Sequence, residues 1–317
     1  MSKTKLSYNS NSHPLVSDLM TEFLYEKEIH GASPATIKTY KGTFKRILDY
    51  INSDTTINQL DKKFVTSFIN FLRTSKLSTA TINHYLRELR AFSYWCMDYG
   101  YIIPRYTITL VKGQESIKET YSEEELILLL EKPKDIHNFV EWRDWAIINW
   151  VLGTGNRIGT IINVKMCDID LHRGFIYITQ QKNKRPNEIP MAFSLNTVLK
   201  EYIRRWRLKA EPEEYLFCNI YGEKLTSNSL KLAIRKYNHN RGVQKTSMHA
   251  FRHTFAKMWV KNGGDVFKLQ KILGHSTLEM TRKYVNLYGA DLKLGFDDIA
   301  PLNTITNTNL SHKKKLY

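Results

Sequence analysis

Residues 249–288 read HAFRHTFAKMWVKNGGDVFKLQKILGHSTLEMTRKYVNLY, and this stretch decides the fold of the C-terminal half. Its apolar periodicity predicts three helices, which cover about 249–262, 265–272 and 276–284. Gly274 can end the second helix in a left-handed turn. Ser276 and Glu279 form a capping box that starts the third helix. The stretch therefore predicts short helices joined by tight corners that bring polar side chains together.

Four polar residues of this stretch have the spacing of a phosphate site. His249 and Arg252 are three residues apart, so a helix presents them on one face. There an arginine fork and a histidine can hold a phosphate. His275 lies at the corner before a new helix, whose free N–H groups attract anions, and Tyr284 follows nine residues later. Each residue taken alone also fits a structural role, as a surface pair, a turn residue or a core tyrosine.

Cationic residues further upstream fit the same chemistry. Arg157 follows an apolar helix over 139–152 and begins an apolar stretch. A guanidinium buried there needs an anionic partner, with a structural ion pair as the alternative. Two short strands are predicted over 174–179 and 187–191. The polar turn between them carries Lys182, Lys184 and Arg185, which can enter a DNA groove or simply form a solvated charged turn.

The N-terminal third of the chain has a helical pattern of its own. Ser33 and Pro34 give one helix an N-cap and a first-turn proline. Two more helices are predicted over 61–74 and 79–98. We expect five segments: a disordered N-terminus (1–13), a helical domain (14–102), a linker (103–120), a second domain (121–300) and a basic tail (301–317). The expected fold class is mainly α with a small β-sheet (α+β).

The composition indicates a nucleic-acid partner. The chain of 317 residues has 47 Lys+Arg against 31 Asp+Glu, a net charge of +16 that is spread along its length and suits a polyanion. No apolar run approaches the ~20 residues of a membrane span, and the first residues lack a secretion signal. Cys96, Cys167 and Cys218 form no CxxC pair. We therefore expect a cytoplasmic, nucleoid-associated protein. We also expect it to need no metal or nucleotide cofactor, because the sequence contains neither a GxxxxGK[ST] loop nor a cluster of carboxylates.

The order of these residues resembles that of one enzyme family. Arginine, hairpin lysine, His-x-x-Arg, Leu-Gly-His and then tyrosine is similar to the catalytic series of the tyrosine recombinase (phage integrase) family, which includes the Xer proteins and mobile-element integrases. The resemblance covers about Leu15 to Ala300. It implies a helical SAM-like core-binding domain over 14–102 and a catalytic domain over 121–300. One departure is Thr160, which stands where the family usually has a supporting glutamate.

The resemblance implies a site-specific recombinase that cleaves and rejoins DNA through a 3′-phosphotyrosyl link and a Holliday junction. The implied catalytic residues are Arg157, Lys182, His249, Arg252, His275 and Tyr284. The arginines and His275 would hold the phosphate that Tyr284 attacks. His249 is the expected general base or orienting group for the tyrosine. Lys182, with Lys184 as the alternative, would protonate the leaving 5′-oxygen.

The same resemblance implies a clamp on DNA and an assembly of protomers. The expected DNA-binding residues are Lys38, Lys41, Asn83, His84, Arg87, Arg90, Lys184 and Arg185. A solvated helix face is the alternative for those of helix 79–98. The expected partners are double-stranded DNA with specific sites and further copies of the chain, as a tetramer on two duplexes. Leu292, Phe296 and Ile299 give residues 287–300 an apolar stripe, which we expect to dock on a neighbouring protomer or, alternatively, on its own domain.

Two other classes remain open from the sequence. A type IB topoisomerase has a similar catalytic set but relaxes supercoiled DNA without a specific site. A non-catalytic DNA-binding regulator could use the same scaffold, although it would not need Tyr284. The sequence also leaves open the target site, any accessory factors, and whether the chain resolves chromosome dimers, integrates a phage or transposes an element.

Overall fold

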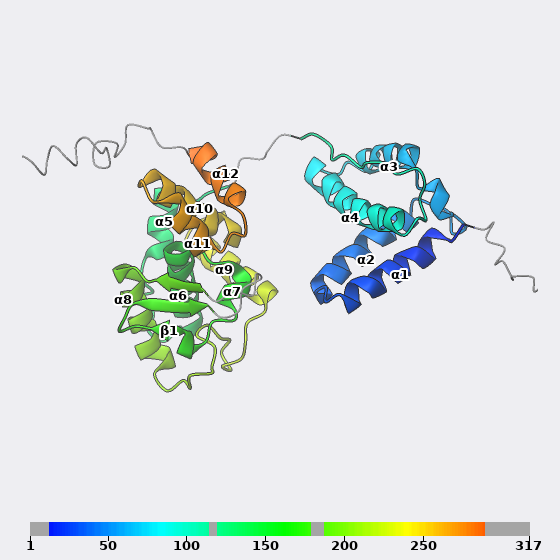
Figure 1. Cartoon of the computed structure of the whole chain (residues 1–317). Coiled ribbons are helices and arrows are strands. Elements are labelled where there is room, and N and C mark those ends of the chain that lie inside the picture. The colour runs from blue at the N-terminus through cyan, green and yellow to red at the C-terminus, as the bar shows by residue number, and fades with distance from the viewer. Residues whose placement is uncertain (1–12, 114–118, 179–186, 289–317) are drawn as a thin grey trace, which may run out of the picture. The chain divides into compact units, whose positions relative to one another are not determined.

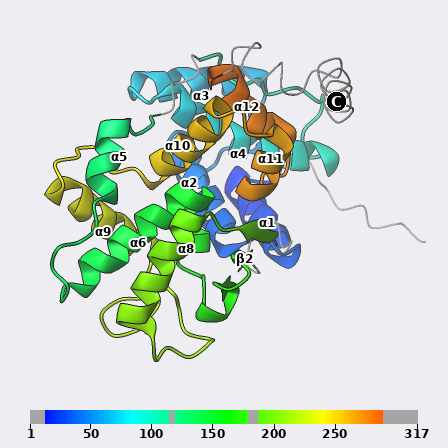
Figure 2. The ribbon, with the colours of Figure 1, turned by 90° about the vertical axis from the view of Figure 1, so that its left-hand side faces the viewer.

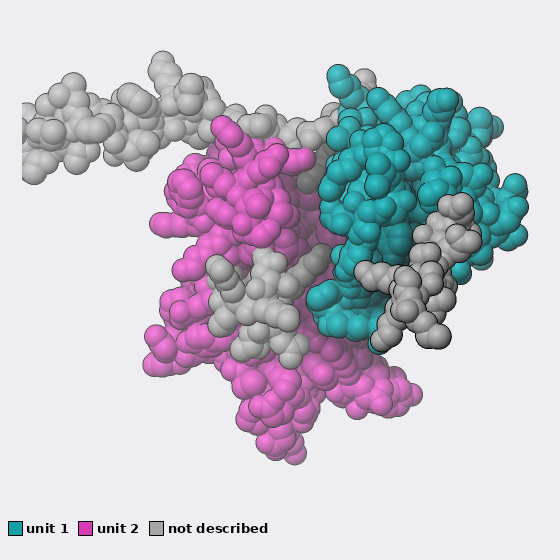
Figure 3. Space-filling model, turned by 45° about the vertical axis from the view of Figure 1, so that its right-hand side comes forward, with its two compact units in different colours: residues 1–116 teal, residues 117–317 magenta. Residues whose placement is uncertain are grey.

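The structure of the chain is a computed structural model that describes residues 13–113, 119–178 and 187–288. The chain divides into two compact units, Met1–Ser116 and Ile117–Tyr317, which are teal and magenta in Figure 3. Each unit has a hydrophobic core of its own, as is usual for separate domains.

The first unit is a bundle of helices (Figure 1). Its elements in chain order are α1 (Val16–Ile29), α2 (Pro34–Leu48), the 3-10 turn η1 (Ile57–Gln59), α3 (Lys62–Thr74) and α4 (Thr79–Asp98). The N-cap predicted at Ser33 is confirmed, because its side chain accepts the Thr36 N–H and proline follows it. Phe23, Phe44 and Phe92 meet in the core with ring centroids 5.3, 5.7 and 5.8 Å apart. Capped helix N-termini and a cluster of aromatic side chains in the core therefore stabilise this unit.

Residues 103–111, expected to belong to the linker, pack against the first unit instead. Ile108 is buried in the core of that unit. The side-chain amide of Asn83, on α4, donates to the carbonyl of Val111 and accepts from its N–H, both at 2.8 Å. The polar and apolar contacts together hold the segment on the helices, so the N-terminal part of the expected linker 103–120 is a fixed part of the unit.

The second unit surrounds one buried helix with shorter ones. Its helical elements are α5 (Glu123–Leu130), α6 (Phe139–Thr154), α7 (Ile158–Ile161), η2 (Met166–Asp168), α8 (Phe193–Tyr202), the π-helical turn η3 (Ile203–Arg207), α9 (Ser227–Asn240), α10 (Met248–Lys261), α11 (Val266–Leu273) and α12 (Leu278–Tyr288). Helix α6 packs against α5, α8, α9 and α10 (Figure 2). Trp142, Ile148 and Trp150 are fully buried on different sides of α6, so this helix packs into the hydrophobic core on all its faces.

A small antiparallel sheet completes the second unit. Its strands β1 (Ile169–Asp170), β2 (Phe175–Ile178) and β3 (Asn187–Pro190) lie in the order β1-β2-β3. Ile176 pairs with Ile189, and both side chains are buried, which fixes the register of the hairpin. The turn between β2 and β3, residues 179–186 with the candidate lysines, lies outside the described residues.

The predicted fold class is confirmed, because helices dominate both units and the sheet has three strands. The elements that were not predicted include α7 with four residues and β1 with two, because such short elements show no periodicity. The expected docking segment 287–300 lies almost wholly outside the described residues. Among the described helices, none combines the length and the hydropathy that crossing a bilayer requires.

Candidate active site

Two helix ends frame the candidate site. Helices α6 and α11 both end at a glycine in the left-handed conformation, Gly155 with φ 63° and Gly274 with φ 60°. Such a residue stops the helical hydrogen bonds and leaves the last carbonyls for other donors. The partial negative charge of a helix C-terminus attracts cations to the same place. The left-handed turn that the sequence predicts at Gly274 is confirmed.

Arg252, on α10, is 5% exposed and donates to both helix ends. Its Nη1 donates to the Gly155 carbonyl at 2.7 Å, and its Nη2 donates to the Leu273 carbonyl at 2.9 Å. Nη2 also lies 2.8 Å from Nε2 of His275. Because a guanidinium has no acceptor, Nε2 must accept this bond. The proton of His275 is then on Nδ1, which donates to Thr281 Oγ1 at 2.8 Å.

Arg157, the N-cap residue of α7, reaches the same end of α11. Its Nη1 donates to the carbonyls of Leu273 and Gly274 at 3.2 and 3.4 Å. Burial lowers the pKa of Arg157. Burial, together with repulsion from Arg157, lowers the pKa of Arg252 to about 10. Two positively charged guanidiniums that are partly buried from water therefore favour the binding of an anion beside them.

In the described part of the chain, neither of these arginines forms an ion pair with a carboxylate. Another buried arginine shows the contrast, because Arg143 donates through Nε and Nη2 to Asp144 at 2.9 and 2.7 Å. Thr160, which stands where the related family has glutamate, gives its backbone N–H to the Arg157 carbonyl at 2.9 Å. The structural ion pair that the sequence left open for Arg157 is therefore replaced by contacts to carbonyls.

Tyr284, on α12, lies beside these cations and is 3% exposed. Its hydroxyl is 2.7 Å from Nδ1 of His253. Tyr284 also lies close enough to Arg252 that a negative charge on the phenol oxygen raises the pKa of this guanidinium. The Tyr284 ring is parallel to the ring of His275, with an interplanar angle of 2° and centroids 6.3 Å apart. The site thus combines a phenol with guanidinium and imidazole groups.

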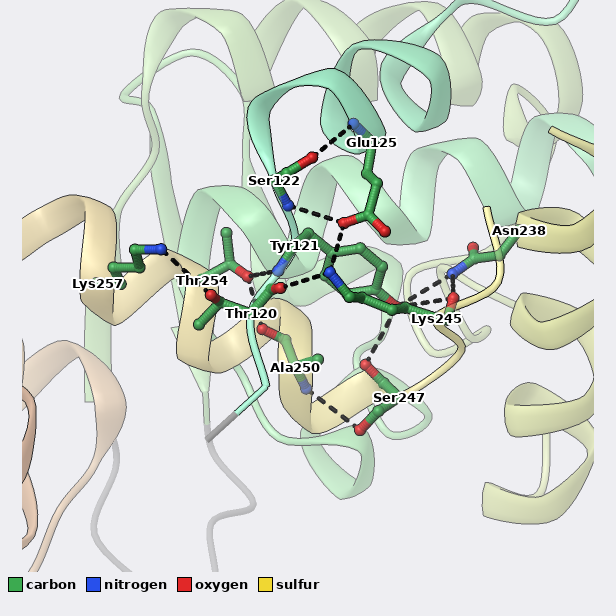
Figure 4. Close-up of polar contacts among 10 residues, drawn as sticks. All are labelled: Thr120, Tyr121, Ser122, Glu125, Asn238, Lys245, Ser247, Ala250, Thr254 and Lys257. Atoms are coloured by element: carbon green, nitrogen blue, oxygen red, sulfur yellow. Dashed lines mark hydrogen bonds and ion pairs between the residues drawn. The ribbon is translucent and has the colours of Figure 1, made fainter. Parts of the chain in front are cut away.

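A network of contacts around Tyr121 holds the start of α10 (Figure 4). The Tyr121 ring stacks on Phe251 with centroids 4.0 Å apart, and its backbone N–H donates to Thr254 Oγ1 at 2.9 Å. Its hydroxyl donates to the carbonyl of Ser247, the N-cap residue of α10, at 3.4 Å. Because these contacts surround the first turns of the helix, they fix the position from which Arg252 reaches the site.

The structure brings four of the predicted catalytic residues together: Arg157, Arg252, His275 and Tyr284. His249 is exposed in the first turn of α10, and its role at the tyrosine remains a prediction. Lys182 and its alternative, Lys184, lie outside the described residues. His253 was not predicted as part of the site, because the spacing of three residues before Arg252 pointed to His249. The signal in the sequence that could have identified His253 is its position directly after Arg252.

The predicted DNA-binding residues of the first unit lie on α2 and α4, which pack against each other. Those with exposed side chains are Lys38, Lys41 and Arg87, and those half-buried are His84 and Arg90. Asn83 has a structural role, because its amide is engaged by the backbone of Val111. Lys184 and Arg185 lie outside the described residues. Contact of the remaining candidates with DNA stays a prediction.

Gly155→Ala should destabilise the second unit. A Cβ at this position would lie 2.6 Å from Leu273 Cδ2 and 2.6 Å from Phe255 Cδ1, and φ 63° is itself unfavourable for a residue with a side chain. We expect a loss of about 1–3 kcal/mol in the free energy of unfolding, measured by urea denaturation. Gly159→Ala is the control, because nothing lies within 4 Å of its added Cβ. Equal losses for the two variants would contradict the role given to this helix end.

Comparison with known proteins agrees with this fold. The phage integrase family matches residues 119–290, and the phage integrase SAM-like domain matches residues 15–105. Tyrosine recombinase XerD of Listeria monocytogenes is 27% identical over 289 residues, which are 88% of this chain and 97% of the relative. Tyrosine recombinase XerD of Staphylococcus epidermidis is 25% identical over 295 residues, which are 90% of this chain and 99% of the relative.

Solved structures share the two-domain fold. The Tn1549 transposon integrase in complex with transposon right end DNA has a TM-score of 0.71 at 20% identity, with 90% of this chain and 100% of the other covered. The lambda integrase dimer bound to a COC′ core site has a TM-score of 0.68 at 17% identity, with 89% and 80% covered. A SAM-like domain followed by an integrase domain defines the architecture of a tyrosine-type DNA recombinase. The chain belongs to the phage integrase family.

Proposed function

We propose that the chain is a site-specific DNA recombinase in which Tyr284 attacks a DNA phosphate. One observation carries the proposal: the phenol lies beside the buried Arg252, and neither this residue nor Arg157 pairs with a carboxylate of the described chain. A phosphodiester suits such a pair, because each guanidinium fork matches two phosphate oxygens. The same place thus offers a nucleophile and a holder for the group that it attacks.

In the proposed cleavage step, the bond from Tyr284 Oη to phosphorus forms as the bond from phosphorus to the 5′-oxygen breaks. Arg157 and Arg252 stabilise the negative charge that builds up on the non-bridging oxygens. The leaving 5′-oxygen takes a proton from Lys182, with Lys184 as the alternative donor. The products are a 3′-phosphotyrosyl link and a 5′-hydroxyl. A 5′-hydroxyl of the partner strand then attacks the link and releases the tyrosine, so no phosphodiester bond is lost.

His275 must exchange a hydrogen bond when the phosphate enters. Its Nε2 accepts from Arg252 in the structure, whereas a phosphate oxygen is itself an acceptor. We expect the phosphate to enter between these two side chains, with Nε2 then protonated. The Nδ1 proton keeps its bond to Thr281 throughout, which holds the ring in place.

The proposed substrate is double-stranded DNA with two recombination sites, held by four protomers at the nucleoid in the cytoplasm. Two structural neighbours support this: a lambda integrase tetramer is bound to a Holliday junction, and XerH is bound to a palindromic difH substrate in a post-cleavage complex. We propose residues 14–102 as the core-binding domain and 121–300 as the catalytic domain. Residues 287–300 would dock on a neighbouring protomer and so couple assembly to the nearby tyrosine.

An assay with the DNA that flanks the gene tests this function. A nicked suicide duplex should trap a covalent protein–DNA species that survives detergent. Excess EDTA should not prevent its formation, because cationic side chains, and not a metal ion, stabilise the negative charge on the phosphate. A plasmid with two copies of the site should recombine. Site-independent relaxation of supercoiled DNA would instead indicate a type IB topoisomerase. Binding without any covalent species would indicate a regulator.

A further inference from the structure

His275 is attached to two different helices. Its backbone N–H donates to the Gln270 carbonyl of α11 at 3.1 Å, and its backbone carbonyl accepts from Gln270 Nε2 at 3.4 Å. Its ring reaches the other way, because Nδ1 lies 2.8 Å from Oγ1 of Thr281 on α12. Gln270 therefore fixes the backbone of the histidine, whereas Thr281 fixes one side of its ring.

The two ring nitrogens of His275 have different partners. Nη2 of Arg252 lies 2.8 Å from Nε2, and because a guanidinium can only donate, Nε2 is an acceptor and Nδ1 carries the proton. Thr281 Oγ1 accepts this proton. The hydrogen bond made by one nitrogen of a histidine sets the state of the other. Both partners therefore direct Nε2 towards the guanidinium.

Only one of these two partners keeps its contact when the phosphate enters. In the proposed function the phosphate takes a place between Arg252 and His275, so the bond from the guanidinium to Nε2 is given up. The contact with Thr281 lies on the opposite side of the ring. Thr281 is completely buried, so water does not compete for its hydroxyl. The orientation of the ring in the phosphate complex then depends on Thr281.

The nucleophile is on the same helix as this hydroxyl. Thr281 and Tyr284 are three residues apart on α12, so they lie on one face of it. The rings of His275 and Tyr284 are parallel, with an interplanar angle of 2° and centroids 6.3 Å apart. One helix therefore carries both the nucleophile and the group that orients the histidine beside it.

We propose that Thr281 is a positioning residue for His275, because its hydroxyl accepts the Nδ1 proton and keeps Nε2 directed at the phosphate. The inference rests on the proposed function, since it presupposes that His275 holds the phosphate that Tyr284 attacks. Thr281 does not touch the reacting atoms and acts only through the imidazole.

Thr281→Val and Thr281→Ser separate the two groups of the side chain. Valine keeps the volume and loses the hydroxyl, whereas serine keeps the hydroxyl and loses the methyl group. We expect single-turnover cleavage of the suicide duplex by Thr281→Val to slow about 10-fold, as one hydrogen bond to a group at the phosphate is lost. DNA affinity should be unchanged, and Thr281→Ser should cleave close to the wild-type rate. If Thr281 only packs the core, serine is the more damaging of the two.

A double-mutant cycle with His275→Asn tests whether Thr281 acts through the histidine. In the His275→Asn background, Thr281→Val should cause no further loss of rate, because the ring that it positions is gone. Thr43→Val is the matched control. Thr43 is also a buried threonine on a helix, but its hydroxyl has no hydrogen-bond partner in the described part of the chain, so cleavage should not change. Equal losses from Thr281→Val in both backgrounds, or cleavage by Thr281→Val at the wild-type rate, would overturn the proposal.

Failure of the inference is distinguishable from failure of the proposed function. If the wild-type protein forms no covalent species, or if Tyr284→Phe still forms it, the proposed function is wrong. If His275→Asn does not slow cleavage, the role of His275 at the phosphate is wrong, and the inference falls with it. If His275→Asn slows cleavage and Thr281→Val does not, only the positioning role is wrong. Thr281→Ala, which also lacks the hydroxyl, replaces Thr281→Val if that variant does not fold.

Discussion

Tyr284→Phe should abolish the covalent protein–DNA species and leave DNA binding intact. Phenylalanine keeps the ring that packs with Ala256, Leu269 and Leu273, but it lacks the oxygen that attacks phosphorus. Loss of the hydrogen bond to His253 costs about 1 kcal/mol, which is too little to unfold the domain. The variant should therefore bind a site like the wild type, with no detectable cleavage.

The measurement for Tyr284→Phe combines a gel shift for binding with a nicked suicide duplex for covalent capture. Tyr288→Phe is the matched control, because it changes the nearest tyrosine of the sequence, on the same helix α12. The control should still form the covalent species. A normal yield from Tyr284→Phe would remove this residue as the nucleophile and point to Tyr288.

Arg252→Gln should have the second largest effect. The variant loses a charge beside the expected phosphate. It removes the guanidinium donor of the Gly155 carbonyl and one of the two guanidinium donors of the Leu273 carbonyl. We expect cleavage to fall by about 1,000-fold, and the free energy of unfolding to fall by about 1–3 kcal/mol. Single-turnover cleavage and urea denaturation measure the two effects separately.

Arg252→Lys distinguishes charge from geometry at the same position. Lysine keeps the positive charge but has no planar fork for two phosphate oxygens, so its cleavage rate should lie between those of Arg252→Gln and the wild type. Folded Arg252→Gln protein that cleaves within threefold of the wild type would contradict the role of this residue in holding the phosphate.

Much of the fold could be predicted because its signals are local. Ser33 and Pro34 specify a helix start by their own chemistry, and the structure confirms it. The left-handed turn at Gly274 is likewise a property of a single residue. The packing of 103–111 on the first unit could not be predicted, because it depends on Asn83, which lies far earlier in the chain.

The candidate site shows the same division between local and tertiary information. The spacing in the sequence identifies Arg252 and Tyr284, and the structure brings them together. The partner of the phenol could not be predicted from spacing. The direction of α12 after the turn at Gly274 sets which histidine of α10 the hydroxyl meets, and the structure has it meet His253. Helix directions depend on packing over the whole unit, which a local motif does not encode.

The mass of the peptide that carries DNA tests the central claim most directly. Trypsin cleaves after Lys283 and Lys293, so wild-type protein trapped on a suicide duplex should release YVNLYGADLK, residues 284–293, joined to nucleotide. Fragmentation should place the added mass on Tyr284, linked through the 3′-phosphate of the cleaved strand. A modification on Tyr288 or on a peptide elsewhere, a link through a 5′-phosphate, or no covalent peptide at all would contradict the account.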